Sequence, residues 1–181
     1  MKAYKAFNKD LTCRGFQYEI GKTYEMNEEP IICERGFHAC IDLDDVFKYY
    51  TFSKDVRICE VELLGDIDDM SQKDSKVATN KIKIIRELSV KDLLELGGNK
   101  SIVQASTYGS SLVTDEMIKN LSELDRIRVV AYGDNRHKNC LVNDESDDVR
   151  FMMAKHSTHE HRDILLHDVC ADVRKRVARY G

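Results

Sequence analysis

The sequence lacks the features that place a protein in a membrane or outside the cell. No apolar run approaches the roughly 20 residues needed to cross a bilayer. The N-terminal segment contains no apolar signal core, and the six cysteines include no Cys-x-x-Cys pair. We therefore expect an intracellular, cytoplasmic protein, without a membrane partner, whose thiols are reduced.

Signatures of common enzymes are also missing. The chain has no glycine-rich phosphate loop and no Gly-x-Ser-x-Gly elbow. Its net charge of -4 comes from the first 96 residues, where 15 Lys and Arg face 19 Asp and Glu. Phosphate contacts need clustered cations, so this balance argues against a general nucleic-acid binder, and we expect no direct sequence-specific nucleic-acid binding. We expect a binding protein rather than an enzyme, with no cofactor, metal or catalytic residues.

The 181 residues, 42% hydrophobic and 33% charged, suit one domain or two small ones. Alternation of apolar and polar residues predicts strands in the first half, and apolar spacing predicts two helices, the first with Asp42 as its N-cap. The expected strands are 13–21, 22–26, 31–33, 56–64 and 78–88, and the expected helices are 43–50 and 89–96.

The composition changes after residue 96. Residues 97–112 are small and polar, which is typical of a linker. From residue 113 onward the pattern indicates short helices. The sequence therefore predicts an α+β protein with a strand-rich domain over 1–96, a linker over 97–112 and a helical domain over 113–181.

The helical part contains a near-repeat. The segment 137–144 returns 24 residues later as 161–168, and Val149-Arg150 returns as Val173-Arg174. A degenerate earlier copy covers 125–131. The pattern resembles the leucine-rich-repeat variant family, which stacks 24-residue units of one α-helix and one 3₁₀ helix into a small solenoid. That resemblance implies a binding surface rather than an active site.

Three phrases in the first half, at 5–10, 13–18 and 34–40, resemble an uncharacterised domain of phages and gut bacteria. Such a domain followed by a helical repeat is similar to type II-A anti-CRISPR proteins. The resemblance implies binding to Cas9 or its guide RNA complex and a block of DNA recognition or cleavage. It leaves the oligomeric state open. A protein-interaction module with an unrelated partner is the first alternative.

Acidic residues are the candidate contacts with such a partner. Cas9 holds nucleic acid in a positively charged channel, and carboxylates presented to that channel would mimic phosphates. We expect Asp148 and Asp172 to cap helices instead. The candidate partner-binding residues are Glu62, Asp66, Asp68, Asp69, Asp144, Glu145 and Asp147.

The cysteines and histidines suggest further chemistry. His38 and Cys40 could form a thiolate nucleophile, although a packed core with a hydrogen-bonded His38 is favoured. Together with Cys13 and Cys33 they could bind zinc, but the spacing lacks a tight chelating pair. A third possibility is metal binding or pH sensing by the C-terminal histidines. His137 and His161 occupy equivalent positions of the near-repeat, which favours a packing role.

The last alternative is a nucleotide-binding sponge or an enzyme. The Gly-Phe-His segment at 36–38, the pair Tyr49-Tyr50 and an early Tyr4 resemble ADP-ribosyltransferase-like folds. That resemblance implies a nucleotide pocket near Tyr4, His38 and Tyr50. It also requires a catalytic glutamate, for which Glu60 or Glu62 is available.

Overall fold

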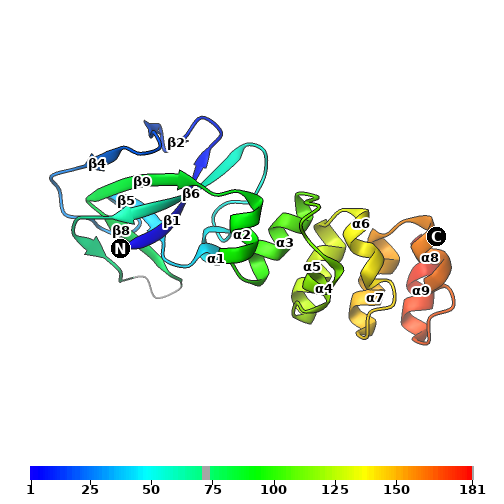
Figure 1. Cartoon of the computed structure of the whole chain (residues 1–181). Helices are drawn as coiled ribbons and strands as arrows, with labels where there is room; N and C mark the ends of the chain where they lie inside the picture. The colour runs from blue at the N-terminus through cyan, green and yellow to red at the C-terminus, as the bar shows by residue number, and fades with distance from the viewer. Residues whose placement is uncertain (71–73, 181) are drawn as a thin grey trace. The chain divides into compact units, whose positions relative to one another are not determined.

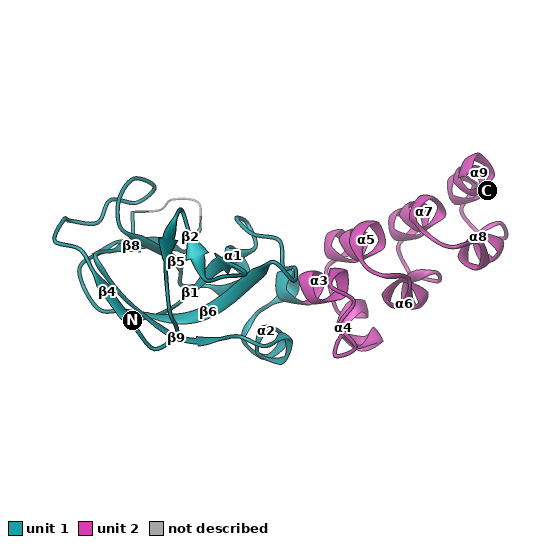
Figure 2. Cartoon of the chain, turned by 90° about the horizontal axis from the view of Figure 1, so that it is seen from above, with its two compact units in different colours: residues 1–101 teal, residues 102–181 magenta. Residues whose placement is uncertain are grey.

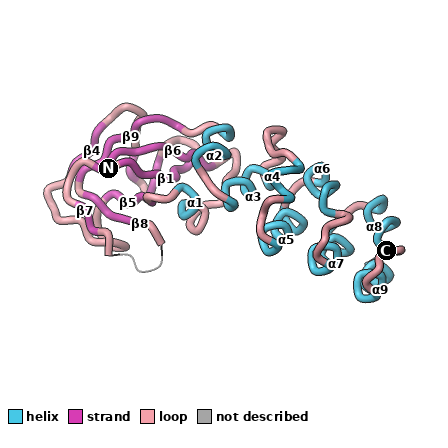
Figure 3. Tube along the Cα trace, turned by 60° about the horizontal axis from the view of Figure 1, so that its bottom comes forward, coloured by secondary structure: helices cyan, strands magenta, loops and turns pink. Residues whose placement is uncertain are grey.

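The computed structural model describes residues 1–70 and 74–180. The chain forms two compact units, residues 1–101 and 102–181 (Figure 2). The strands belong to the first unit, and the described part of the second unit is helical (Figure 3). The predicted α+β class is confirmed. The division falls within helix α3 (Asn99–Thr107), so the segment predicted as a linker contains a helix.

The first unit is built on one antiparallel sheet in the order β4-β9-β6-β1-β5-β8-β7 (Figure 1). Strand β1 lies at its centre, and residues 3–7 are all buried because both faces of the strand are covered. A separate hairpin pairs β2 (Thr12–Cys13) with β3 (Phe16–Gln17). The strands of the sheet are β1 (Lys2–Asn8), β4 (Thr23–Glu25), β5 (Phe37–Cys40), β6 (Val56–Leu63), β7 (Ile67–Asp68), β8 (Lys76–Thr79) and β9 (Lys81–Glu87).

Three predicted strands are corrected by local turns. The expected strand 31–33 is a turn closed by pairing of Ile31 with Arg35, because Cys33 has a φ of 68°, outside the extended region. The expected strand 13–21 is the β2–β3 hairpin. The expected strand 78–88 is interrupted at Asn80, whose side-chain oxygen accepts a hydrogen bond from the backbone of Asp66 at 2.9 Å.

Two short helices accompany the sheet. Helix α1 (Leu43–Val46) begins after Asp42, whose carboxylate accepts a hydrogen bond from the backbone of Asp44 as predicted. It ends well before residue 50. Helix α2 (Val90–Leu96) begins with a capping box between Ser89 and Asp92.

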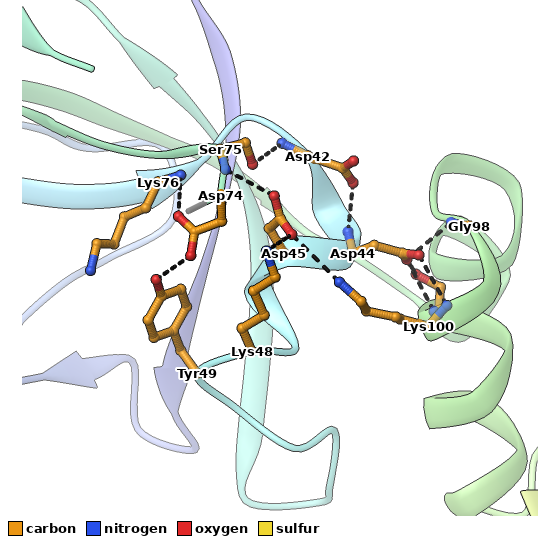
Figure 4. A network of polar contacts seen from close by, with 11 residues as sticks. Asp42, Asp44, Asp45, Lys48, Tyr49, Asp74, Ser75, Lys76, Gly98 and Lys100 are labelled. Carbon is orange, nitrogen blue, oxygen red and sulfur yellow. Dashed lines mark hydrogen bonds and ion pairs between the residues drawn. The ribbon is translucent and has the colours of Figure 1, made fainter. Parts of the chain in front are cut away.

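Asp44 caps a helix other than its own (Figure 4). Its carboxylate accepts hydrogen bonds from the backbones of Gly98, Lys100 and Ser101 at 3.0 Å each, and from the Ser101 hydroxyl at 2.7 Å. A side chain at Gly98 would place a Cβ 2.9 Å from this carboxylate, so glycine permits the approach. The neighbouring Asp45 binds the backbone of Ser75 at 2.9 Å. These contacts fasten α1 to two other segments of the first unit.

Buried side chains form two clusters on the opposite faces of the sheet. One contains Phe7, Val61 and Ile84. The other packs Leu43 of α1 and Leu93 of α2 against strand residues. The alternation of strand residues between the two faces follows the two-residue period of a strand.

In the helical part, helices α3, α5, α7 and α9 begin 24 residues apart, at 99, 123, 147 and 171. This spacing extends the sequence period back into the expected linker. Shorter helices lie between them. The bounds are α4 (Asp115–Lys119), α5 (Glu123–Tyr132), α6 (Asn135–Lys138), the 3₁₀ helix η1 (Asn139–Leu141), α7 (Asp147–His156), α8 (His159–Leu165) and α9 (Ala171–Tyr180).

Arginine contacts recur with the same spacing. Arg126 binds the Asp144 carboxylate at 2.8 Å, and Arg150 binds that of Asp168 at 2.7 Å. A second contact is common to Arg126, Arg150 and Arg174. In each, the guanidinium donates a hydrogen bond to the backbone carbonyl of the residue five positions earlier. These arginines, each the fourth residue of α5, α7 or α9, thus tie their helix to the turn before it, and Arg126 and Arg150 also bind the turn before the next long helix.

The expected cap of α7 is corrected. The N-cap is Ser146, whose hydroxyl accepts a hydrogen bond from the backbone of Val149. Asp148 lies in the first turn, where its negative charge interacts favourably with the helix dipole. Asp172 similarly lies in the first turn of α9 and binds Lys175 at 3.0 Å.

Candidate functional site

The first group of acidic candidates is Glu62, Asp66, Asp68 and Asp69, and some of these side chains already interact with other parts of the fold. Glu62 is half-buried on β6, opposite Lys2 and Lys83 in the sheet register. Asp68 accepts hydrogen bonds from two backbone amides, including that of Ile32 at 2.8 Å, which lower its pKa.

The carboxylate of Asp66 accepts a hydrogen bond from the Asn80 side chain at 3.0 Å, while Asp69 is exposed. Asp66 therefore also stabilises a turn. Asp69 is the member of this group that offers its charge most openly to a partner.

The second acidic group differs from residue to residue. The Asp144 side chain is only 5% exposed and faces Arg126, so it presents little surface to a partner. Glu145 is 88% exposed and lies 3.5 Å from the same guanidinium. Asp147 is exposed at the start of α7. Burial in an ion pair therefore removes one of the three candidates from the surface.

A cavity of about 650 Å³ opens in the first unit. Strands β1 and β5 contribute to its wall, together with the β2–β3 hairpin and the segment after α1. The lining contains many aromatic side chains and several basic side chains. The aromatic and charged lining residues are Tyr4, Phe16, Tyr18, Tyr24, Phe37, Tyr49, Tyr50, Lys5, Arg14, His38, Lys76, Glu25 and Glu34.

Lys5 is the buried cation of this cavity. Its residue is 8% exposed, and its ammonium donates to the His38 carbonyl at 2.9 Å and contacts the Cys13 sulfur at 3.6 Å. Among the described residues, no carboxylate lies within 4 Å of it. Burial lowers the pKa of Lys5, because an ammonium removed from water loses hydration.

His38 does not form a nucleophilic pair with Cys40, although both line the cavity. Its Nε2 accepts a hydrogen bond from the backbone of Cys33 at 2.9 Å. Burial lowers the pKa of His38, and the nearby Lys5, Arg14 and Lys76 lower it further. Burial raises the pKa of the Cys40 thiol to about 12. The favoured interpretation, a packed strand with a hydrogen-bonded histidine, agrees with these contacts.

The rings around the cavity support one another. Phe16 contacts Tyr18, Tyr24 and Phe37 edge to face, with centroids 4.8 to 6.2 Å apart. On another part of the lining, Tyr49 donates to Asp74 and lies beneath the Lys76 ammonium at 4.7 Å (Figure 4). Phe16 is nevertheless 46% exposed, so part of its surface remains available to a ligand.

The predicted nucleotide pocket is partly matched by this lining. Tyr4, His38 and Tyr50 all reach the cavity, as the resemblance to ADP-ribosyltransferase-like folds implies. Neither Glu60 nor Glu62 does; Glu60 binds Lys2 and Arg86 instead. The glutamate that such a transferase would need is therefore not supplied by either candidate.

Sequence reasoning missed the cations. Lys5 lies within the segment Ala3–Phe7, and the four remaining residues of this segment are all apolar or aromatic. A charge inside a buried strand is the signal that would have identified it. Arg14 and Lys76 carry no comparable signal, because only the tertiary fold brings the hairpin and β8 to β5.

The metal hypotheses gain no geometric support. Within residues 1–70 and 74–180, no three His, Cys, Asp or Glu side chains gather closely enough to hold an ion. His161 lies 2.8 Å from the Asn139 side chain, and His137 lies 3.1 Å from the Ser110 carbonyl. Both histidines are buried, consistent with packing.

Comparison with known families now defines the first unit. Residues 1–96 match the family described as Domain of unknown function (DUF7666). The chain belongs to this family. The DUF7666 match covers the sheet and α2, and thus the whole cavity lining.

No curated protein and no solved structure matches the chain. The helices of the described residues are all too short or too polar to cross a membrane. The DUF7666 assignment carries no activity with it, so any function must be argued from the cavity and the surfaces.

Proposed function

We propose that the DUF7666 cavity binds a nucleotide, a small molecule that combines an aromatic base with phosphate. The observation that carries this proposal is the buried Lys5 ammonium, which has no carboxylate partner among the described residues. A buried charge is costly unless it is paired. A phosphate in the cavity would supply the missing negative charge.

The rest of the lining fits the same ligand class. Arg14 and Lys76 add cations to the lining around Lys5, whereas of the two lining acids, Glu25 and Glu34, the first is paired with Lys81 at 2.8 Å. The rings offer stacking surfaces for a base. A volume of about 650 Å³ lies within the usual range of small-molecule sites.

The test is calorimetric titration of the full chain with AMP, ADP, adenosine and pyrophosphate. We expect both nucleotides to bind more tightly than adenosine, which lacks phosphate, and than pyrophosphate, which lacks a base. Lys5→Met should weaken nucleotide binding by about tenfold or more, the equivalent of one charge-assisted hydrogen bond. Lys9→Met, the same change at an exposed position just after β1, is the matched control.

Two results would contradict the proposal. One is the absence of both binding heat and a rise in melting temperature with any nucleotide, since a tight ligand stabilises the folded state. The other is unchanged affinity in Lys5→Met. Affinity should also fall as the pH rises through the lowered pKa of Lys5, because the free ammonium is lost there.

A second candidate is inhibition of Cas9 by an acidic surface. The exposed carboxylates of Asp69, Glu145 and Asp147 favour it, as does the excess of acid in the first 96 residues. In a DNA-cleavage assay with several Cas9 orthologues, excess protein should slow cutting, and Glu145→Gln with Asp147→Asn should weaken the effect. Unchanged cutting at large excess would end this hypothesis.

A further inference from the structure

The second unit separates its charges along its long helices. Residues 102–181, the second unit, contain 13 acidic and 12 basic residues, a net charge of -1. The acids lie in the first turns: Glu123 and Asp125 in α5, Asp147 and Asp148 in α7, and Asp172 in α9. The last turns of α7 and α9 instead contain Lys155, His156 and Arg179.

These helices pack side by side, α5 against α7 and α7 against α9 (Figures 1 and 3). They follow a 24-residue period, so equivalent ends lie along the same edge of the unit. The acidic first turns of α5, α7 and α9 therefore form one edge, and the basic last turns of α7 and α9 form part of another, to which the last turn of α5 adds no basic residue. A nearly neutral total charge thus conceals a local basic edge.

A row of rings lies at the C-terminal ends of the long helices. Tyr132, His156 and Tyr180 end α5, α7 and α9 and are spaced by 24 residues. Tyr108 precedes them by the same interval. Tyr132 is 71% exposed, Tyr108 48% and Tyr180 37%, while His156 is half-buried. We call these four residues the ring row.

Cations without carboxylate partners accompany the α7 and α9 part of the ring row. In the part of the chain that the structure describes, Lys155, Arg176 and Arg179 form no ion pair. The Arg176 guanidinium lies 4.3 Å from the Phe151 ring centre and 5.1 Å from that of Tyr180. Its plane is thus already packed among rings.

The surroundings of His156 support a positive edge. Burial lowers the pKa of His156, and Lys155, Lys138 and Arg176 lower it further. The acid next in sequence to Tyr132, Asp134, is engaged at the start of α6, where its carboxylate accepts a hydrogen bond from the backbone of His137 at 3.1 Å.

We propose that the ring row binds single-stranded nucleic acid, with one base stacked per 24-residue unit. Packed helices lie about 8–10 Å apart, and other helical-repeat proteins read one base per repeat. Rings and guanidinium planes stack on any base, while the cations neutralise the backbone. An acidic peptide would meet the same charges but would gain nothing from the rings, so the rings favour nucleic acid.

The test is fluorescence anisotropy of the full chain with labelled ten-nucleotide U₁₀ RNA and T₁₀ DNA. Tyr132→Ser and Tyr180→Ser should each weaken binding about fivefold or more, as expected for loss of one stacked base. Arg176→Ser should also reduce the salt slope, log Kd against log salt, by about 0.7 for one lost phosphate contact. Circular dichroism would verify that the variants remain helical.

Matched controls lie on the same helices. Leu124→Ser removes a 58% exposed apolar side chain from α5, and Lys175→Ser removes a cation that is paired with Asp172 in α9. Both should bind like the unchanged protein. The proposal is overturned by the absence of binding, by controls that lose as much affinity as the ring variants, or by a ten-residue polyglutamate that binds equally well.

Discussion

At the scale of single residues, the most informative position is Lys5. It lies on the central strand between apolar neighbours, where a methionine of similar length would fit with no charge to desolvate. Burial lowers its pKa, so the folded state binds a proton less readily at this site than the unfolded chain does. Lys5 therefore costs stability in the absence of a ligand, which fits a binding role better than a structural one.

Lys5→Met should increase the free energy of unfolding near pH 7.5, on the order of 1 kcal/mol. The lysine of the unfolded chain titrates near the ordinary pKa of 10.5, above the folded value. The contribution of Lys5 to the stability of the unchanged protein should consequently become less unfavourable as the pH rises to 10.5, because the unfolded state holds more protons at this site. The advantage of methionine should therefore shrink toward pH 10.5.

Urea denaturation of both proteins between pH 7.5 and 10.5 measures this difference. A stability difference that does not change with pH would contradict the assignment of a buried, poorly hydrated ammonium. Lys9→Met, at an exposed position, should show no pH-dependent difference and separates the effect of burial from that of charge alone.

At the scale of elements, helix starts depend on how their first amides are satisfied. Helices α5 and α7 use their own serines, Ser122 and Ser146, as N-caps. The equivalent position before α3 is Gly98, which has no side chain, and the carboxylate of Asp44 takes over. The start of α3 is thus fixed by a residue more than 50 positions away in sequence.

Asp44→Ala should release the amides at the start of α3 and destabilise the fold by about 2 kcal/mol, the upper range for a helix cap. Hydrogen exchange of peptides covering 97–107 should accelerate, while those covering β6 should not. Asp42→Ala, which removes the cap of α1 itself, is the control and should leave exchange at 97–107 nearly unchanged. Unaltered exchange in Asp44→Ala would show that water satisfies these amides equally well.

At the scale of the whole molecule, the reactivity of the six thiols measures how well the protein interior is shielded from solvent. All are unbridged. Burial raises the pKa of Cys40 and Cys59 to about 12 and that of Cys140 to about 11, whereas Cys33 is exposed. Reactivity follows the thiolate and its accessibility.

Alkylation at pH 8 followed by mass spectrometry should therefore modify Cys33 first. Cys40 and Cys59 should remain unmodified until denaturant is added, when all six become reactive. Rapid modification of Cys59 in the native protein would mean that the central sheet opens far more readily than its burial indicates.

How much of the site the sequence predicts depends on the type of signal. Tyr4, His38 and Tyr50 could be placed near one cavity because a family resemblance brings distant segments together. Asp144 was expected at the surface because charged residues usually lie there. Its burial depends on Arg126, and nothing local marks that pairing. No sequence pattern marks the ring row, because its members share a 24-residue period but not a residue type. They are Tyr108, Tyr132, His156 and Tyr180.

The sequence by itself determined the α+β class, the capped start of α1, and the 24-residue period. These depend on local alternation, capping and spacing, which act over a few residues. Only the tertiary structure decided that residues 97–112 contain a helix, that Lys5 lies in a ring-lined cavity and that Asp144 is paired. Each of these depends on contacts between segments distant in sequence, whose free energy no local pattern encodes.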